Sequence, residues 1–334
     1  MKIKDLRKLT ISKRLNFLLG SGCSTNAIPL MRYYQNNCEN LTQANNKLEE
    51  KVKQVSEVLV NEKYEEIEAQ KEVNKTLKTY VYFIQKVIET LNLSNSRETP
   101  RKANIFTTNY DLFIEKAFDV LSRDYQFIIN DGSRGYFDKI LESSNFDQVV
   151  SYKGINDNYI SELPSISLIK PHGSMNWDKD ESKERVCIRN NVVQKPLIVK
   201  PTGMESADTF SQNHFFSMLR FFTNELDKPQ SILVVVGFSF QDKHIAKMVK
   251  RATANSELLI MCFCFSASDV ESILTNLGFE LNEQIPRNIQ FIVPIHKNLS
   301  KLEKKNYNLN IIERNNLTLF NVIEFMNGVF DEKD

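Results

Sequence analysis

Four polar clusters follow candidate strands, at the positions where each strand would end. They are Gly20-Ser-Gly-Cys-Ser24, Thr107-Thr-Asn-Tyr-Asp111, Pro171-His-Gly-Ser174 and Gly237-Phe-Ser-Phe-Gln-Asp242. In doubly wound sheets, ligands bind outside the carboxyl ends of the strands. Each cluster alone is weak evidence, but four at equivalent positions predict a ligand site.

The first cluster has the composition of a phosphate-binding turn. Gly20 and Gly22 would let the backbone approach a pyrophosphate. A helix starting after Ser24 or Thr25 would favour the negative charge. The third glycine of the G-x-G-x-x-G pattern is missing, so a plain tight turn is the alternative.

The second and third clusters contain side chains that can take part in catalysis. Asn109 and Asp111 place an amide and a carboxylate at one strand end. His172 is one of four histidines, and an imidazole with a pKa near ~6.5 can act as a general base at neutral pH. Structural roles are also open to them: Thr108 or Asn109 as a helix N-cap, and His172 as a hydrogen-bonded core histidine.

In the fourth cluster, Gly237 would allow close backbone approach and Ser239 could bind a phosphate or ribose. Asp242 is better placed to cap the next helix.

In this order, the four clusters resemble those of the sirtuin family, and more closely its prokaryotic SIR2-like branch. That branch shows G-[AS]-G-x-S, T-T-N-Y-D, K-x-H-G-S and G-[FY]-S-x-x-D-x-H-I segments. They match Gly20–Ser24, Thr107–Asp111, Lys170–Ser174 and Gly237–Ile245. The resemblance spans roughly Leu15 to Phe263.

The resemblance implies an NAD hydrolase that cleaves the nicotinamide–ribose bond. It assigns Asn109 to the ribose and the attacking water, Asp111 to the nicotinamide side and His172 to the general base. The residues it implies for holding the rest of NAD are Gly20, Ser21, Gly22, Ser24, Thr108, Gly237 and Ser239.

Two departures from deacetylating sirtuins bear on the activity. The two C-x-x-C pairs of their zinc ribbon are missing, so we expect no zinc. Leu30 and Met31 stand where that family has Asp and Phe. An NAD-dependent deacylase or ADP-ribosyltransferase, and a non-catalytic NAD or ADP-ribose sensor, remain as alternatives.

Related SIR2-like domains deplete NAD in bacterial anti-phage defence, some of them with a separate HerA-like ATPase. The resemblance therefore implies NAD as substrate, a defence-system partner on another chain and a homo-oligomer.

The elements that position these clusters alternate as strand, turn and helix. Apolar runs at Leu15–Leu19, Ala103–Thr107, Ser165–Ile169, Ser231–Val236, Leu258–Phe263 and Ile289–Val293 predict strands. The pattern predicts an α/β fold, a Rossmann-like parallel sheet with helices on both faces. Residues 135–163 are poorly patterned and predict loop and irregular structure.

Residues 38–100 differ in amino-acid composition from the rest of the chain. They are rich in Glu, Lys, Gln and Asn, lack glycine and carry apolar residues at helical spacing. We expect a helical insertion within a single NAD-binding domain spanning residues 1–334. Its apolar positions exceed what one packed face requires, which favours a role in self-assembly or partner docking.

Composition excludes several classes of protein. The chain has 334 residues with 43 Lys and Arg against 42 Asp and Glu, which argues against direct nucleic-acid binding. No apolar run is long enough to span a membrane, and the N-terminus lacks a signal peptide. We therefore expect a cytoplasmic protein whose five cysteines are free thiols.

Overall fold

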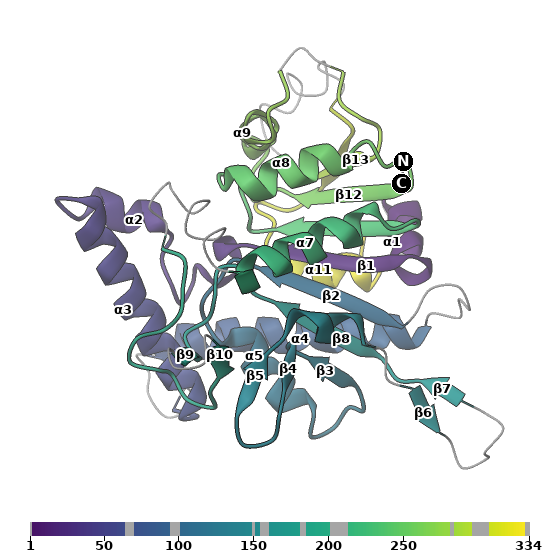
Figure 1. The fold of residues 1–334 in the computed structure, drawn as a ribbon. Coiled ribbons are helices and arrows are strands. Elements are labelled where there is room, and N and C mark those ends of the chain that lie inside the picture. The colour runs from purple at the N-terminus through teal and green to yellow at the C-terminus, as the bar shows by residue number, and fades with distance from the viewer. Residues whose placement is uncertain are drawn as a thin grey trace. The chain divides into compact units, whose positions relative to one another are not determined.

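The computed structural model describes residues 2–63, 70–93, 101–148, 151–153, 160–180, 185–200, 213–280, 284–295 and 307–330. Its main sheet has eight strands in the order β14-β13-β12-β11-β1-β2-β8-β3 (Figure 1). The pairings of β1 with β11, of β11 through β14 in turn, and of β3 with β8 are all parallel. The predicted α/β class with a Rossmann-like parallel sheet is confirmed.

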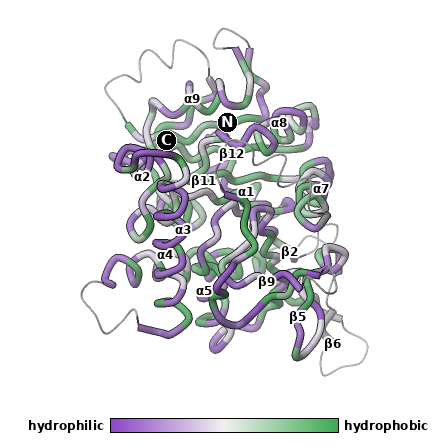
Figure 2. Tube along the Cα trace, turned by 60° about the vertical axis from the view of Figure 1, so that its left-hand side comes forward, coloured by the Kyte–Doolittle hydropathy of each residue, from purple (hydrophilic) through white to green (hydrophobic). Residues whose placement is uncertain are grey.

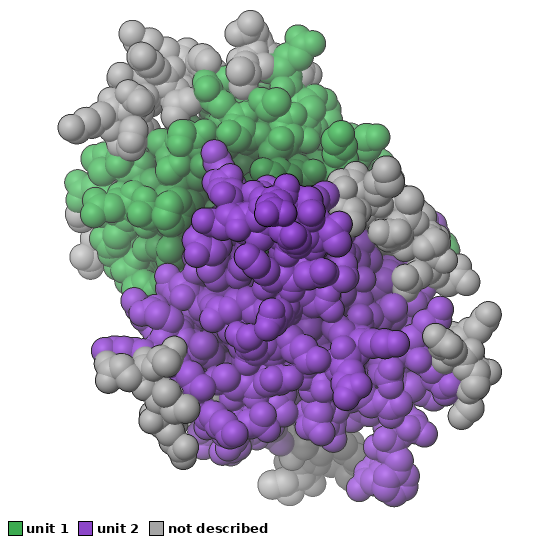
Figure 3. All heavy atoms as spheres, turned by 90° about the vertical axis from the view of Figure 1, so that its left-hand side faces the viewer, with its two compact units in different colours: residues 1–23, 86–106, 219–334 green, residues 24–85, 107–218 purple. Residues whose placement is uncertain are grey.

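The chain divides into two compact units, which Figure 3 colours separately. Unit 1 contains residues 1–23, 86–106 and 219–334, and unit 2 contains residues 24–85 and 107–218. The prediction of a single domain interrupted by an insertion at residues 38–100 stays a prediction.

Unit 1 contains most of the parallel sheet. Its strands are β1 (Arg14–Leu19), β2 (Lys102–Thr107, whose last residue belongs to unit 2), β11 (Ser231–Val236), β12 (Leu258–Phe263), β13 (Ile289–Pro294) and β14 (Leu309–Ile312). β11, β12 and β13 are buried along their whole length, which explains their unbroken apolar sequence.

The helices of this part of the chain are α1 (Ile3–Ser12), α7 (Asn213–Asp227), α8 (Lys243–Ala252), α9 (Asp269–Leu277) and α11 (Leu319–Met326). Figure 1 shows α8 in front of the strands and α11 behind them. Along α7 and α8 the tube of Figure 2 alternates between hydrophilic and hydrophobic colours, as expected for helices with one buried face.

Among the described residues, unit 2 contains two long helices, two strands at one edge of the main sheet and two small antiparallel sheets. α3 (Leu41–Val60) and α4 (Lys71–Leu93, whose last eight residues belong to unit 1) follow the short α2 (Met31–Asn36), and α5 spans Phe113–Leu121. β3 (Ile128–Asn130) pairs with β8 (Ser165–Ile169). β4 (Ser133–Arg134), β5 (Lys139–Leu141), β10 (Arg185–Ile188) and β9 (Trp177–Asp180) form an antiparallel sheet in that order, and β6 (Ser151–Lys153) pairs with β7 (Ile160–Glu162).

The structure corrects two expectations about local structure. Residues 135–163 are not simply a loop, because they contribute β5, β6, β7 and a short 3-10 helix at Ser143–Asp147. These strands have only three residues each, too few for an alternating pattern to show in the sequence.

The helix expected directly after the first glycine turn is also absent. Ser21–Ser24 forms a 3-10 turn, and the next helix, α2, begins only at Met31. Pro29 has no N–H to continue a helical hydrogen-bond pattern, which accounts for the interruption.

Most of the apolar side chains of α3 and α4 are buried within the chain itself. Leu59, Leu77, Phe83, Val87 and Ile88 are all buried. The surplus of apolar positions that favoured an assembly role is therefore small, and Leu41, Tyr82 and Leu93 are its exposed members.

No helix in the described ranges combines the length and the hydrophobicity that crossing a lipid bilayer requires.

Candidate functional site

Two loops of unit 2 bring together the three predicted catalytic residues. Asn109 and Asp111 follow β2, and His172 follows β8, and all three are buried. The N–H of Met175 donates to the carbonyl of Tyr110 at 3.0 Å. The Tyr110 hydroxyl donates to the carbonyl of Val199, beside the His172 turn. The two loops therefore hold each other in place.

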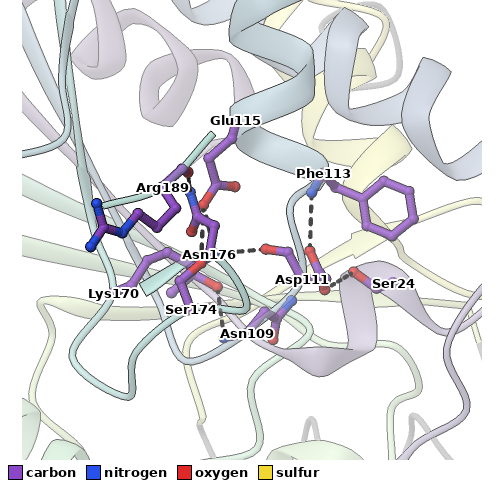
Figure 4. A network of polar contacts seen from close by, with 10 residues as sticks. Ser24, Asn109, Asp111, Phe113, Glu115, Lys170, Ser174, Asn176 and Arg189 are labelled. Atoms are coloured by element: carbon purple, nitrogen blue, oxygen red, sulfur yellow. Dashed lines mark hydrogen bonds and ion pairs between the residues drawn. The ribbon is translucent and has the colours of Figure 1, made fainter. Parts of the chain in front are cut away.

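Both oxygens of the Asp111 carboxylate accept hydrogen bonds within the protein (Figure 4). The N–H of Phe113 donates to Oδ1 at 3.3 Å, and the hydroxyl of Ser24 donates to Oδ2 at 3.0 Å. Ser24 Oγ also lies 2.9 Å from the hydroxyl of Tyr80. A carboxylate has lone pairs for about four hydrogen bonds, so each oxygen can still accept from a ligand.

Burial raises the pKa of Asp111 to about 6, because removing a carboxylate from water disfavours its charged form. The positive charge of Lys170 opposes this shift, and the negative charge of Glu115 adds to it. The hydrogen bonds from Phe113 and Ser24 lower the pKa. At neutral pH the carboxylate is thus mostly ionised.

Lys170 connects the two loops from within the interior. Its ammonium donates to the Asp111 backbone carbonyl at 2.6 Å, to Glu115 Oε1 at 2.8 Å and to Ser174 Oγ at 2.9 Å. The lysine is 2% exposed, and these three acceptors satisfy its three protons. Lys170 therefore fixes the start of the His172 turn against the main chain of Asp111.

The His172 turn requires its glycine. Gly173 has φ +87°, and a Cβ there would lie 1.9 Å from the Leu197 carbonyl oxygen. The N–H of Val199 donates to the His172 carbonyl at 2.8 Å, and that of Ser174 to the Leu197 carbonyl at 3.3 Å. The backbone of residues 197–199 thus pairs with the turn on both sides of Gly173.

Helix capping accounts for Asp242 but not for Thr108 or Asn109. The N-cap of α5 is Leu112, without a side-chain cap bond, so neither Thr108 nor Asn109 caps the helix. Asp242 does cap α8, since Oδ1 accepts from the N–H groups of His244 and Ile245.

In unit 1, Gly20, Gly22 and Gly237 pack against one another. The N–H of Gly20 donates to the Val236 carbonyl at 3.0 Å, and that of Gly22 to the Gly237 carbonyl at 2.9 Å. A Cβ on Gly20 would lie 2.2 Å from the Gly237 carbonyl oxygen. These glycines let two strand-end loops touch, and the N–H groups of Gly20 and Gly22 are engaged within the protein.

The predicted hydroxyl contacts to NAD differ in accessibility. Ser21 and Ser239 are exposed, Thr108 is half-buried and Ser24 is buried. The Ser24 hydroxyl donates to Asp111 within the protein. The assignment of these residues to NAD binding stays a prediction.

Sequence reasoning assigned no role to Tyr80, Glu115 or Lys170. A charged residue directly after the buried strand Ser165–Ile169 was the available signal for Lys170. Glu115 lies four residues after Asp111 and could have been placed beside it only if the helix start had been known. Tyr80 falls in a row of apolar positions, where its hydroxyl gives no signal.

In the described ranges, no group of three or more His, Cys, Asp or Glu side chains could hold a metal ion. The expectation that the protein carries no zinc stays a prediction.

Comparison with known proteins gives one family match. A family model described as a SIR2-like domain matches residues 103–312, more than half of the chain. That range contains the two loops that hold Asn109, Asp111 and His172. A search of curated proteins found no match to the chain.

Proposed function

The chain belongs to the SIR2-like domain family, and we propose on this basis that it hydrolyses NAD at the nicotinamide–ribose bond. SIR2-like proteins use NAD and are typically NAD-dependent enzymes. The observation that carries the proposal is the pairing of the two loops, which places Asn109 and Asp111 beside the turn of His172.

The reaction breaks the C1′–N bond of NAD. Nicotinamide leaves with the bonding electron pair and becomes neutral, while positive charge builds on the ribose, as in glycoside hydrolysis. A water oxygen then bonds to C1′ and loses a proton to a base. The products are nicotinamide, ADP-ribose and one proton.

Each of the three residues has a role that its chemistry supports. His172 accepts the proton from water or from a ribose hydroxyl. Asn109 orients the ribose and the water, which its amide can do as both donor and acceptor. Asp111 lies on the nicotinamide side. Its ionised carboxylate stabilises the positive charge of the transition state. The attraction between the two charges is stronger in this buried site than it would be in water.

The test is to incubate the purified chain with NAD and to identify the products by chromatography. Equal amounts of free nicotinamide and ADP-ribose are expected without any acyl-peptide. Release that requires an acyl-peptide would indicate a deacylase, and ADP-ribose attached to protein would indicate a transferase. Binding of NAD without nicotinamide release would indicate a sensor, and each of these three results contradicts the proposal.

The resemblance to anti-phage NAD hydrolases extends the proposal to the cell. We propose that the chain depletes cytoplasmic NAD during infection, as a homo-oligomer or with a separate HerA-like ATPase. Cells expressing the chain should lose NAD after phage addition, and cells expressing His172→Ala should not. Unchanged NAD in infected cells would contradict this cellular role while leaving the chemistry intact.

A further inference from the structure

We propose that Tyr80 of α4 is a positioning residue for the reaction, which orients the Asp111 carboxylate through the hydroxyl of Ser24. This inference rests on the proposed function, because it assigns Tyr80 a part in the same chemistry. Neither the sequence motifs nor the family match includes Tyr80, which lies outside residues 103–312.

Asp111, Ser24, Tyr80 and Phe113 form a closed ring of contacts. Asp111 Oδ2 accepts from Ser24 at 3.0 Å, and Ser24 Oγ lies 2.9 Å from the Tyr80 hydroxyl. The Tyr80 ring stacks on the ring of Phe113, with centroids 5.3 Å apart and planes 2° apart. The backbone N–H of Phe113 donates to Asp111 Oδ1 at 3.3 Å, which closes the ring. Both carboxylate oxygens are therefore held by groups that Tyr80 contacts.

The direction of the hydrogen bonds follows from a count of protons. A serine hydroxyl has one proton, and Ser24 gives it to the ionised Asp111. At its contact with Tyr80, Ser24 must then be the acceptor, so the phenol is the donor. Hydrogen bonds in such a chain polarise one another, so donation by Tyr80 strengthens the bond from Ser24 to the carboxylate.

The charged groups that face Asp111 come from two other elements. Lys170, after β8, favours the ionised carboxylate, and Glu115 of α5 disfavours it. Burial works against the charge as well, and the hydrogen bond from Ser24 works for it. The Tyr80–Ser24 pair, like Lys170, therefore favours the ionised form of Asp111.

The ring and the hydroxyl of Tyr80 have separate functions. Tyr80 is 1% exposed, and a phenylalanine would fill the same space and keep the stack on Phe113. The variant Tyr80→Phe therefore removes the hydrogen bond with little change in packing. Tyr82, two residues along the same helix, is 54% exposed, so Tyr82→Phe is the matched control.

The first measurement is kcat for NAD cleavage as a function of pH. In Tyr80→Phe we expect the acid limb, to which protonation of both Asp111 and the base His172 contributes, to move to higher pH by up to roughly half a unit, because the hydrogen bond from Tyr80 to Ser24 is lost. Melting temperature should change little, and Tyr82→Phe should match the parent. If Tyr80→Phe leaves both the acid limb and the plateau value of kcat unchanged, the proposal is overturned.

A second measurement does not depend on activity. The carboxyl carbon of Asp111 can be titrated by ¹³C NMR in protein labelled at aspartate, with Asp111→Asn identifying its signal. We expect its midpoint to rise in Tyr80→Phe and to stay unchanged in Tyr82→Phe. The midpoint could rise in Tyr80→Phe even though the parent protein does not cleave NAD. That result would support the positioning role of Tyr80 and contradict only the proposed reaction. An unchanged midpoint defeats the positioning role, whatever the activity.

Discussion

Asp111 has partners that lie far away in the sequence. Ser24 precedes it by 87 residues, and Lys170 follows it by 59. The sequence placed Asn109, Asp111 and His172 at strand ends, and their loops do meet in unit 2. The residues that fix Asp111 could not be predicted, because nothing local to Ser24 or Tyr80 points to a carboxylate.

The buried Asp111 carboxylate also makes stability depend on pH. Its pKa is about 6 in the folded protein, above the ordinary value of 3.8. The folded state therefore holds this proton more tightly than the unfolded state does. The favourable contribution of the protonated Asp111 to the free energy of unfolding is complete below about pH 4. It falls as the pH rises to about 6 and is absent above that pH.

We therefore expect Asp111→Asn to abolish NAD cleavage without lowering stability at pH 8. The amide is uncharged and can still accept from the Phe113 N–H, while Ser24 can accept from its NH₂ group. The melting temperature of the variant should equal or exceed that of the parent at pH 8, and this advantage should disappear near pH 4. A variant that melts well below the parent at pH 8 would contradict the role of burial in raising the pKa of Asp111.

At the scale of elements, the loops after β1 and β11 show that glycines in a predicted ligand-binding motif also have a structural role. The glycines were expected to let the backbone approach a phosphate, which stays a prediction, and in the structure they also let the two loops pack closely. The sequence could not distinguish these roles, because both require the absence of a side chain at a strand end. The helix expected after Ser24 is absent and α2 begins only at Met31, so no helix N-terminus directly follows the first turn.

Gly20→Ala should destabilise the protein far more than the same change at Gly278. The new methyl group of Gly20→Ala would lie 2.2 Å from the Gly237 carbonyl oxygen, and backbone atoms there have little room to move. We expect a loss of about 3 kcal/mol or more in the free energy of unfolding.

Gly278 provides the matched control in the same unit. Its φ is +78°, and an added Cβ would meet only the Lys250 side chain at 3.5 Å or beyond. The cost there should be about 1 kcal/mol, from the left-handed backbone alone. Urea unfolding of the two variants measures the difference, and equal losses would refute the close packing of the two loops.

At the scale of the whole molecule, the class of fold was predictable and the strand order was not. Apolar runs bounded by turn residues matched β1, β2, β8, β11, β12 and β13 closely. The order β14-β13-β12-β11-β1-β2-β8-β3 depends on which strand pairs with which, and apolar runs of similar composition do not encode that choice. The antiparallel pairing of the short strands of unit 2 was not predicted, because these strands have only two to four residues.

The central claim is that the loops of unit 2 cleave NAD, and nicotinamide release by three variants tests it most directly. His172→Ala and Asn109→Ala should each lower the rate by at least about 100-fold, the usual contribution of a general base or a positioned reactant. Asp242→Ala, which loses only the cap of α8, should be destabilised by about 1 kcal/mol and retain near-parental cleavage. Melting temperature verifies that each variant is folded. If His172→Ala melts like the parent and releases nicotinamide at the parental rate, the roles assigned to these loops are wrong.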